Sequence, residues 1–301
     1  MKRTLALVVS MIFLISALAI SVSAAGRSNA TVDILKFAKA PTIDGVLTEA
    51  EWGKPTVSVK CADMKQDSGC VFTTTASGDG TFVADNQNLP ISFDLYLRWD
   101  NDNFYMALVT PDTTPFNPGV GTGNIWNGDF FQVKFDPNGP AKSFSAQTTE
   151  CGFAVHKDAK FGAWGYSGLE GFENYFANIS TLKAVNDGAK TTYEVAIPWG
   201  KIVPSDAIAQ IKAGKEYGYA TVLLTASTGD YESWLTWGDG ICNPQADDIR
   251  VGSNKIVLSD TAAVVEEKPV VVTPETGDMM IFAVAAILLS AGCAFVAVKR
   301  R

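Results

Sequence analysis

The sequence has 301 residues, and its 24 Lys and Arg against 32 Asp and Glu give a formal net charge of −8. This acidic balance argues against nucleic-acid binding, which depends on clustered Lys and Arg. The single histidine, His156, and the lack of a Cys-x-x-Cys pair argue against zinc fingers and multi-histidine metal sites.

The first 25 residues have the layout of a secretory signal peptide. A basic pair next to Met1 precedes an apolar run from Leu5 to Ile20, and small residues follow up to Ala25. This order of basic, apolar and small-residue segments is typical of an export signal that is removed after the small residues. We therefore predict a cleaved signal peptide over residues 1–25.

The C-terminal end has the pattern of a membrane anchor. An apolar run from Met279 to Val298 has about the length that spans a bilayer, and Lys299, Arg300 and Arg301 close the chain. Basic residues stay on the cytoplasmic side of a membrane, so the preceding part of the chain should face outward. We predict one transmembrane helix over residues 279–298.

The stretch Thr273-Pro-Glu-Thr-Gly277 stands directly before this helix. Together with the apolar span and the basic tail, residues 273–301 resemble the cell-wall sorting signal of Gram-positive bacteria, with Thr273 in place of the usual Leu. The resemblance implies sortase cleavage between Thr276 and Gly277 and attachment to peptidoglycan. If sortase does not accept the motif, the helix itself anchors the chain, and both outcomes place the domain at the cell surface.

Residues 31–260 are expected to form one domain, followed by a Glu-, Pro- and Val-rich linker over 261–276. Without residues 1–25 and 277–301, which signal-peptide and sortase cleavage would remove, the chain keeps 19 basic and 31 acidic residues, a formal charge of −12. Four cysteines lie in the exported part, where disulfides are permitted. A Cys61–Cys70 link, which closes a short loop, is the simplest of the pairings that four cysteines allow, and free, buried thiols are the alternative.

The first elements expected in chain order are a turn at Pro41–Gly45 and one helical turn over Thr48–Trp52. Thr48 and Glu51 have the spacing of a capping box, and Trp52 is predicted to pack inward. The polar segment 61–88 is predicted to be an insertion loop or a ragged hairpin. A strand then follows over Ile91–Trp99 with clean alternation, and a turn at 100–103 leads to a partner strand over 104–109.

The next strand follows a turn signal at Asn127-Gly128, with Trp126 at the lip of the turn. Its apolar residues Phe131, Val133 and Phe135 share one face. Phe130, Gln132, Lys134 and Asp136 share the other, which is predicted to stay wet.

The second half of the domain is predicted to hold further short strands and one helix. Segment 142–180 is dense in aromatics and glycines and is interpreted as loop-rich. Strands are predicted over 192–197, 217–224, 232–237 and 255–258, and a surface helix with Ser205 as N-cap over 205–212. Many short strands with regular turns predict an all-β fold, an antiparallel β-sandwich that is jelly-roll-like.

The motifs that carry a family resemblance follow one another along the domain: Pro41-Thr-Ile-Asp-Gly45 with Glu51-Trp52, Trp99-Asp-Asn-Asp-Asn-Phe-Tyr105, Ile125-Trp-Asn-Gly-Asp129, Tyr193-Glu-Val-Ala-Ile-Pro-Trp199 and Trp237-Gly-Asp-Gly240. In this order the sequence resembles carbohydrate-binding module family 9, within the wider DOMON-like group. The resemblance implies a β-sandwich in which two tryptophans clamp a sugar ring.

Trp126 matches the first clamp tryptophan of that family. Indole rings stack on the apolar faces of sugars, and nearby amides and carboxylates select hydroxyl geometry. Asn127, Asp129 and Gln132 are the candidate polar contacts. Trp237 is a further candidate, although it looks more like the family's framework tryptophan. The region of the second clamp, Cys242–Gln245, carries no ring, and Gly152, Ala154 and His156 occupy other ligand-contacting positions.

We therefore expect a non-catalytic cell-surface protein that binds glycan chains in polysaccharide capture or catabolism. One alternative is a structural or adhesive domain without a small ligand. Another is a haem-binding DOMON-type domain with His156 and Met106 as ligands. Catalysis by Asp129 with Glu194 has little support, because glycoside hydrolysis needs two facing carboxylates. No cofactor is expected apart from calcium near Asp100, Asp102, Asp247 and Asp248, where turn formation is the simpler interpretation.

Overall fold

The computed structural model describes residues 30–63, 70–72, 91–120, 125–140, 145–156, 160–169, 181–226, 233–238, 241 and 253–263. The predicted signal peptide, sorting signal and transmembrane helix lie outside these residues and stay predictions. Within the described ranges, no helix is both long enough and apolar enough to cross a membrane. Contacts divide the chain into two compact units, Met1–Val265 and Glu266–Arg301, and all described residues belong to the first.

Strands are the main secondary structure of the described chain and the helices are few and short, which confirms the all-β class. Its strands are β1 (Thr31–Lys36), β2 (Val57–Lys60), β3 (Cys70–Phe72), β4 (Ser92–Trp99), β5 (Asn103–Pro111), β6 (Phe130–Asp136), β7 (Thr149–His156), β8 (Lys160–Ser167), β9 (Leu182–Asn186), β10 (Lys190–Pro198), β11 (Glu216–Thr225), β12 (Ser233–Trp237) and β13 (Asn254–Ala262). The short helices are α2 (Glu49–Trp52), η1 (Cys61–Asp63), α4 (Trp199–Ile202) and η4 (Ile208–Gln210).

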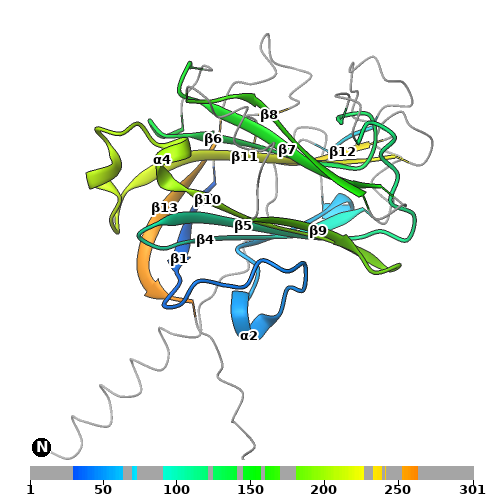
Figure 1. The fold of residues 1–301 in the computed structure, drawn as a ribbon, viewed down its shortest axis with the longest axis horizontal. Coiled ribbons are helices and arrows are strands. Elements are labelled where there is room, and N and C mark those ends of the chain that lie inside the picture. Colours follow the sequence, from blue (N-terminus) through cyan, green and yellow to red (C-terminus); the bar gives the residue numbers. More distant parts are fainter. Residues whose placement is uncertain are drawn as a thin grey trace, which may run out of the picture. The chain divides into compact units, whose positions relative to one another are not determined.

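One curled sheet forms both layers of the sandwich. Its strand order is β8-β7-β6-β11-β13-β1-β4-β5-β10-β9, with β12 beside β11, β3 beside β12, and β2 beside β4. Figure 1 shows β6, β7, β8, β11 and β12 in one layer, β4, β5, β9 and β10 in the other, and β1 and β13 joining them at one side. The pairing is antiparallel except at β1, which runs parallel to both β13 and β4.

The core lies between the two layers and follows the predicted alternation. Phe131, Val133 and Phe135 of β6 face it, as do the odd-numbered residues of β4 from Phe93 to Trp99. Tilted and edge-on ring contacts fill the middle, such as Phe135 with Tyr217 at 5.0 Å between ring centres. Apolar burial on this scale supplies most of the driving force for folding.

The outer face of the β6 layer is also buried, so the prediction of a wet face was wrong. Phe130, Lys134 and Asp136 are at most 1% exposed and Gln132 is 9% exposed. A second apolar cluster covers this face, with Ile125, Phe130 and Trp234 among its members and the partly buried Val120 packed against it. Alternation shows which residues share a face, but a covering loop is a long-range feature that the pattern does not carry.

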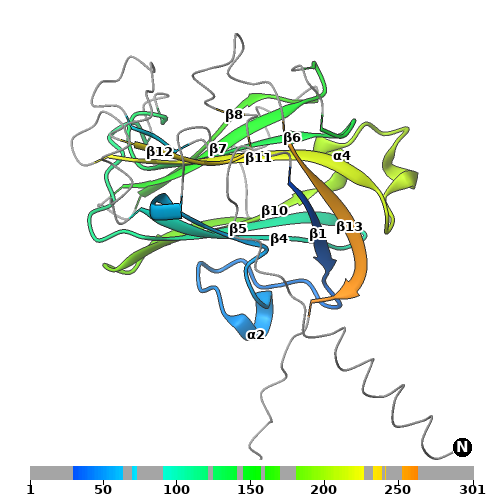
Figure 2. The same cartoon turned by 180° about the vertical axis from the view of Figure 1, so that it is seen from behind.

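The outer face of the other layer is covered by residues 37–54, which wrap around it as Figure 2 shows with α2 below β4 and β5. Trp52 is fully buried there and packs edge-on to Phe37 at 5.4 Å, which confirms its inward position. The capping box was wrong, because Thr48 makes no side-chain cap and Glu51 accepts a hydrogen bond from the N–H of Thr42.

Two further predictions about elements were wrong. The helix over 205–212 is reduced to the single 3₁₀ turn η4, which has no buried side chain to stabilise a longer helix. The segment 142–180, which was interpreted as loop-rich, contains the paired strands β7 and β8. Glycine in these strands has a packing reason, because a Cβ on Gly152 would lie 2.0 Å from the Phe130 ring and one on Gly162 would lie 2.7 Å from Ile125.

The predicted Cys61–Cys70 disulfide is not settled by the structure. Cys61 begins η1 directly after β2 and its side chain is fully buried. Cys70 begins β3, and its side chain lies outside the described residues. The link therefore stays a prediction.

Candidate functional site

The candidate site centres on the corner Ile125–Asp129, directly before β6. Trp126 is 38% exposed there, whereas the neighbouring Ile125 is buried in the outer apolar cluster. The other exposed large apolar side chains of the described ranges are Val46, Val185 and Ile208, so Trp126 is the one aromatic ring among them. The solvent-exposed part of this indole can stack on an apolar surface of a ligand.

Asp129 fastens the corner to two other segments of the chain. Its Oδ2 accepts a hydrogen bond from the N–H of Phe116 at 2.6 Å, and its Oδ1 accepts one from the N–H of Ala226 at 2.7 Å. The N–H of Asp129 in turn donates to the carbonyl of Phe116 at 2.8 Å. At 9% exposure, this carboxylate holds backbone together, and charge-assisted bonds of this kind are strong.

The turn at Asn127-Gly128 requires its glycine. Gly128 has φ +147°, and a Cβ there would lie 2.4 Å from the Phe116 carbonyl oxygen and 2.7 Å from the Asn117 Cα. The close approach lets the segment 116–117 run directly behind the corner. Asn127 itself is half-buried beside Trp126.

Asn117 is part of this corner, and the sequence reasoning missed it. Its side-chain amide is fully buried and donates to the carbonyls of Ile125 at 2.6 Å and Asp129 at 2.9 Å. The local signal is weak, because Asn117 stands before a proline in a Gly- and Pro-rich connection, where a turn residue is the ordinary expectation.

Gln132 lies on the outer face of β6, two residues beyond Phe130. Its Nε2 donates to Oε1 of Glu150 on β7, and Lys134 stands directly opposite Glu150 in the pairing of these strands. All three side chains are at most 9% exposed. Gln132 is therefore part of a buried polar row next to the corner rather than a solvated strand face.

The neighbouring positions on β7 are filled by apolar side chains. The Phe130 ring covers Gly152, and Ala154 is fully buried in the outer cluster. His156 is half-buried at the end of β7, where its Nδ1 accepts a hydrogen bond from the N–H of Asn117 at 3.1 Å and its ring lies edge-on to Phe116 at 5.9 Å.

The structure places Trp237 away from this site. It is 2% exposed on the core side of β12, with its ring 6.0 Å from that of Tyr219. Such a buried ring serves the framework of the sandwich. The structure thus brings Trp126, Asn127, Asp129 and Gln132 together on one stretch and leaves Trp237 in the core.

The residues considered for haem and for catalysis do not meet. Met106 is buried between the layers and accepts a hydrogen bond from the Tyr219 hydroxyl at 3.4 Å, whereas His156 lies on the outer face of β7. Glu194 lies under residues 44 and 45, and its Oε2 accepts hydrogen bonds from the N–H groups of Asp44 and Gly45 at 3.0 and 2.6 Å. Asp129 belongs to the other layer, so it does not face Glu194.

Hydrogen bonds of a turn account for the acidic side chain of Asp100. Asp100 Oδ1 accepts hydrogen bonds from the N–H groups of Asp102 at 2.8 Å and Asn103 at 2.7 Å, and Oδ2 accepts one from the Tyr105 hydroxyl at 2.6 Å. These bonds form the turn between β4 and β5. Among the described side chains, no group of three or more is arranged to hold a metal ion, and Asp247 and Asp248 lie outside that set.

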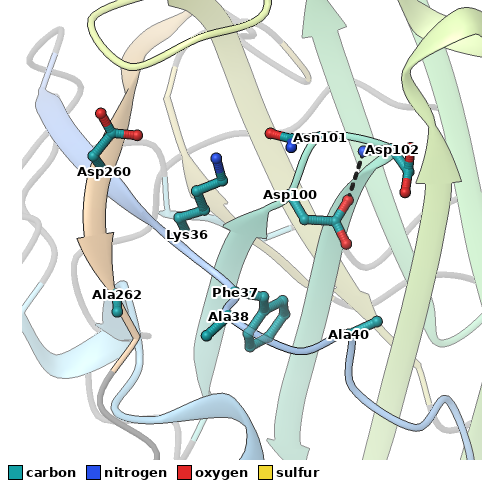
Figure 3. Close-up of a pocket in the computed structure, with 9 residues that line it drawn as sticks. All are labelled: Lys36, Phe37, Ala38, Ala40, Asp100, Asn101, Asp102, Asp260 and Ala262. Atoms are coloured by element: carbon teal, nitrogen blue, oxygen red, sulfur yellow. Dashed lines mark hydrogen bonds between the residues drawn. The ribbon is translucent and has the colours of Figure 1, made fainter.

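A hollow of about 430 Å³ lies beside this turn, where the ends of β1 and β13 meet it. Figure 3 shows Lys36 and Asp260 at one side and the bond from the Asp102 N–H to Asp100 at the other. The Lys36 ammonium lies 4.5 Å over the Trp99 ring, so it is partly engaged. None of the predicted sugar-binding residues lines this hollow.

Comparison of the sequence with protein-family models and with curated proteins gives no match. Among solved structures, the fold is similar to that of a family 9 carbohydrate-binding module from Caldicellulosiruptor kristjanssonii in complex with cellotriose. The TM-score is 0.50 at 14% sequence identity, over 79% of this chain and 100% of the module.

A family 9 module from the same organism in complex with glucose gives a TM-score of 0.45 and 13% identity, over 79% of this chain and 100% of that one. The first likeness shows the fold: this chain has a β-sandwich of the kind found in carbohydrate-binding modules.

Proposed function

We propose that this chain is a non-catalytic carbohydrate-binding protein of the cell surface, which captures glycan chains on the Trp126 platform. The observation that carries the proposal is an indole 38% exposed at a corner that hydrogen bonds hold rigid. A stacking ring that is fixed before binding loses little conformational freedom when a sugar arrives.

The resemblance of the Ile125–Asp129 motif to the family's first clamp supports a sugar as the ligand. The likeness in fold to a module that was solved with cellotriose makes a β-linked glucan oligosaccharide the first probe to use. In this proposal Trp126 stacks on the apolar face of a sugar ring, and the half-buried amide of Asn127 contacts its hydroxyls.

Surface display is the second part of the proposal. The predicted signal peptide, the Thr273–Gly277 motif and the predicted helix over 279–298 support export followed by anchoring to peptidoglycan or to the membrane. Release of the protein from intact cells by a peptidoglycan hydrolase would support covalent attachment, whereas release by detergent alone would support anchoring by the helix.

The test of binding is isothermal titration of the full chain with cellotriose, together with retention on an array of glycans. Trp126→Ala should weaken binding about 30-fold or more, because truncation of a central aromatic contact costs about 2 kcal/mol. Trp126→Phe keeps a ring and should retain part of the affinity. Ile208→Ala removes a side chain of similar exposure, at 36%, and should bind like the wild type.

Two outcomes would count against the proposal. Equal binding by the wild type and Trp126→Ala, with unchanged thermal melting, would remove Trp126 from the site. An array with no glycan retained above background would favour a structural or adhesive surface domain instead.

A further inference from the structure

One buried amide closes the Trp126 corner from behind. The Nδ2 group of Asn117 donates to the carbonyl of Ile125, immediately before Trp126, and to the carbonyl of Asp129, where the corner ends. A single side chain thus bridges both ends of the turn that carries the indole. The side chain is fully buried, so water does not compete for these bonds.

The hydrogen bonds of Asn117 are complete. Its Oδ1 accepts a hydrogen bond from the N–H of Gly119 at 3.0 Å, and its own N–H donates to Nδ1 of His156 at 3.1 Å. A buried amide with all its groups paired specifies one conformation, whereas a partly paired one is costly. Aspartate has the same shape but lacks the two N–H donors, and it would place a carboxylate against two carbonyl oxygens.

These bonds also tie the corner to the sheet. The bond to His156 fixes segment 116–119 to the end of β7, while Asp129 fixes the corner to Ala226 just after β11. Trp126 is therefore placed relative to both neighbours of β6. Asn117 takes part in both links of this corner, although it lies behind the corner and is fully buried.

We propose that Asn117 is the positioning residue of the Trp126 platform, which it holds in the binding conformation before ligand arrives. The proposal rests on the proposed glycan-binding function and adds how that site is preorganised. Without Asn117, the corner has to be ordered during binding. That cost should weaken binding about tenfold, the scale expected for ordering a side chain and its loop.

The first arm of the test uses variants of the full chain. Asn117→Ala should weaken cellotriose binding about tenfold in titration calorimetry. It should also make Trp126 more accessible to acrylamide. The quenching of Trp126 fluorescence is obtained as the difference between each protein and the same protein carrying Trp126→Phe, for the wild type and for Asn117→Ala. The matched control is Asn138→Ala, which removes an exposed amide bonded to Gln147 in the β6–β7 turn and should change neither readout.

The second arm needs no variant, so it remains decisive if Asn117→Ala does not fold. In the ligand-free wild type, the N–H groups of Phe116, Gly119 and Asp129 should be as protected from hydrogen exchange as those of β6. Cellotriose should not change their exchange. Rapid exchange in the free protein would overturn the proposal, because the corner would then not be preorganised.

Unchanged affinity and unchanged quenching in Asn117→Ala would also overturn it. If the wild type itself binds neither cellotriose nor another glycan, the proposed function fails. The quenching and exchange measurements need no glycan bound, so they would still decide whether Asn117 positions Trp126.

Discussion

Replacing Arg98 by Met should test how the outer face of the β4 layer is held. Arg98 is 2% exposed on β4, and its guanidinium donates to backbone and hydroxyl oxygens. Nε and Nη2 donate to the Trp52 carbonyl at 3.1 and 2.7 Å, and Nη2 also donates to the Lys54 carbonyl at 2.5 Å. Nη1 donates to Thr56 Oγ1 at 2.7 Å and to the Leu97 carbonyl at 2.8 Å.

The magnitude follows from these contacts. Burial lowers the pKa of Arg98 from 12.5 to about 10, so the side chain is still a cation at neutral pH. Hydrogen bonds to a charged group each contribute about 1.5–3 kcal/mol, and the loss of solvation of the cation offsets much of their sum. Removing one partner of such a buried network costs about 3–5 kcal/mol. For a domain of this size, the melting temperature should fall by about 10 °C.

The assay is calorimetric melting and urea unfolding of Arg98→Met, with Arg98→Lys and Lys54→Ala alongside. Lys keeps the charge but cannot reach both carbonyls and the hydroxyl at once. The melting temperature of Arg98→Lys should therefore lie between those of Arg98→Met and Lys54→Ala. Lys54 is exposed, and removing its side chain should leave the melting temperature unchanged. A fall of less than ~2 °C for Arg98→Met would refute the reasoning, because it corresponds to under ~1 kcal/mol.

Two other substitutions test single features of the packing. Burial raises the pKa of Glu194 above its ordinary 4.5, only partly offset by the N–H groups of Gly45 and Asp44. Folding therefore favours the protonated form of Glu194. The stability that this group contributes is fully present below pH 4.5 and is lost as the pH rises through its folded-state pKa. Glu194→Gln should gain melting temperature relative to the wild type from pH 4 to pH 7, and a constant difference would contradict this. Gly152→Ala should cost about 1–3 kcal/mol through the clash with Phe130. Gly200→Ala, whose added Cβ would meet only Ile208 at 3.6 Å, should cost nothing in the same urea titration, and equal losses would exclude the clash as the cause.

Alternating strands were the part of the fold that sequence could predict. The inward residues of β4 and β6 were assigned correctly because polar and apolar residues alternate cleanly in both strands. The failures concern features that depend on distant partners. Lys134 and Asp136 are buried because other segments cover them, and Gly152 stands in a strand because Phe130 fills the space of a side chain.

The corner shows the same division between local and distant signals. The Asn127-Gly128 turn and the ring at its lip are local, and sequence found both. The hydrogen bonds that hold the corner are not local, because the amides that bind the Asp129 carboxylate come from residues 13 and 97 positions away. Asn117 joins the corner to His156, 39 positions further along the chain. The residue type of Asn117 and its place before a proline suggested only a loop.

The burial of both outer faces changes what the predicted site residues can do. Gln132 and Asp129 are each 9% exposed and bonded to protein groups, so they shape and hold the corner. Trp126 and Asn127 are more accessible, at the lip of the corner. In the proposed function, ligand contact therefore begins with the ring and the amide at this lip. The residues behind them determine whether that ring is already in place when a glycan arrives.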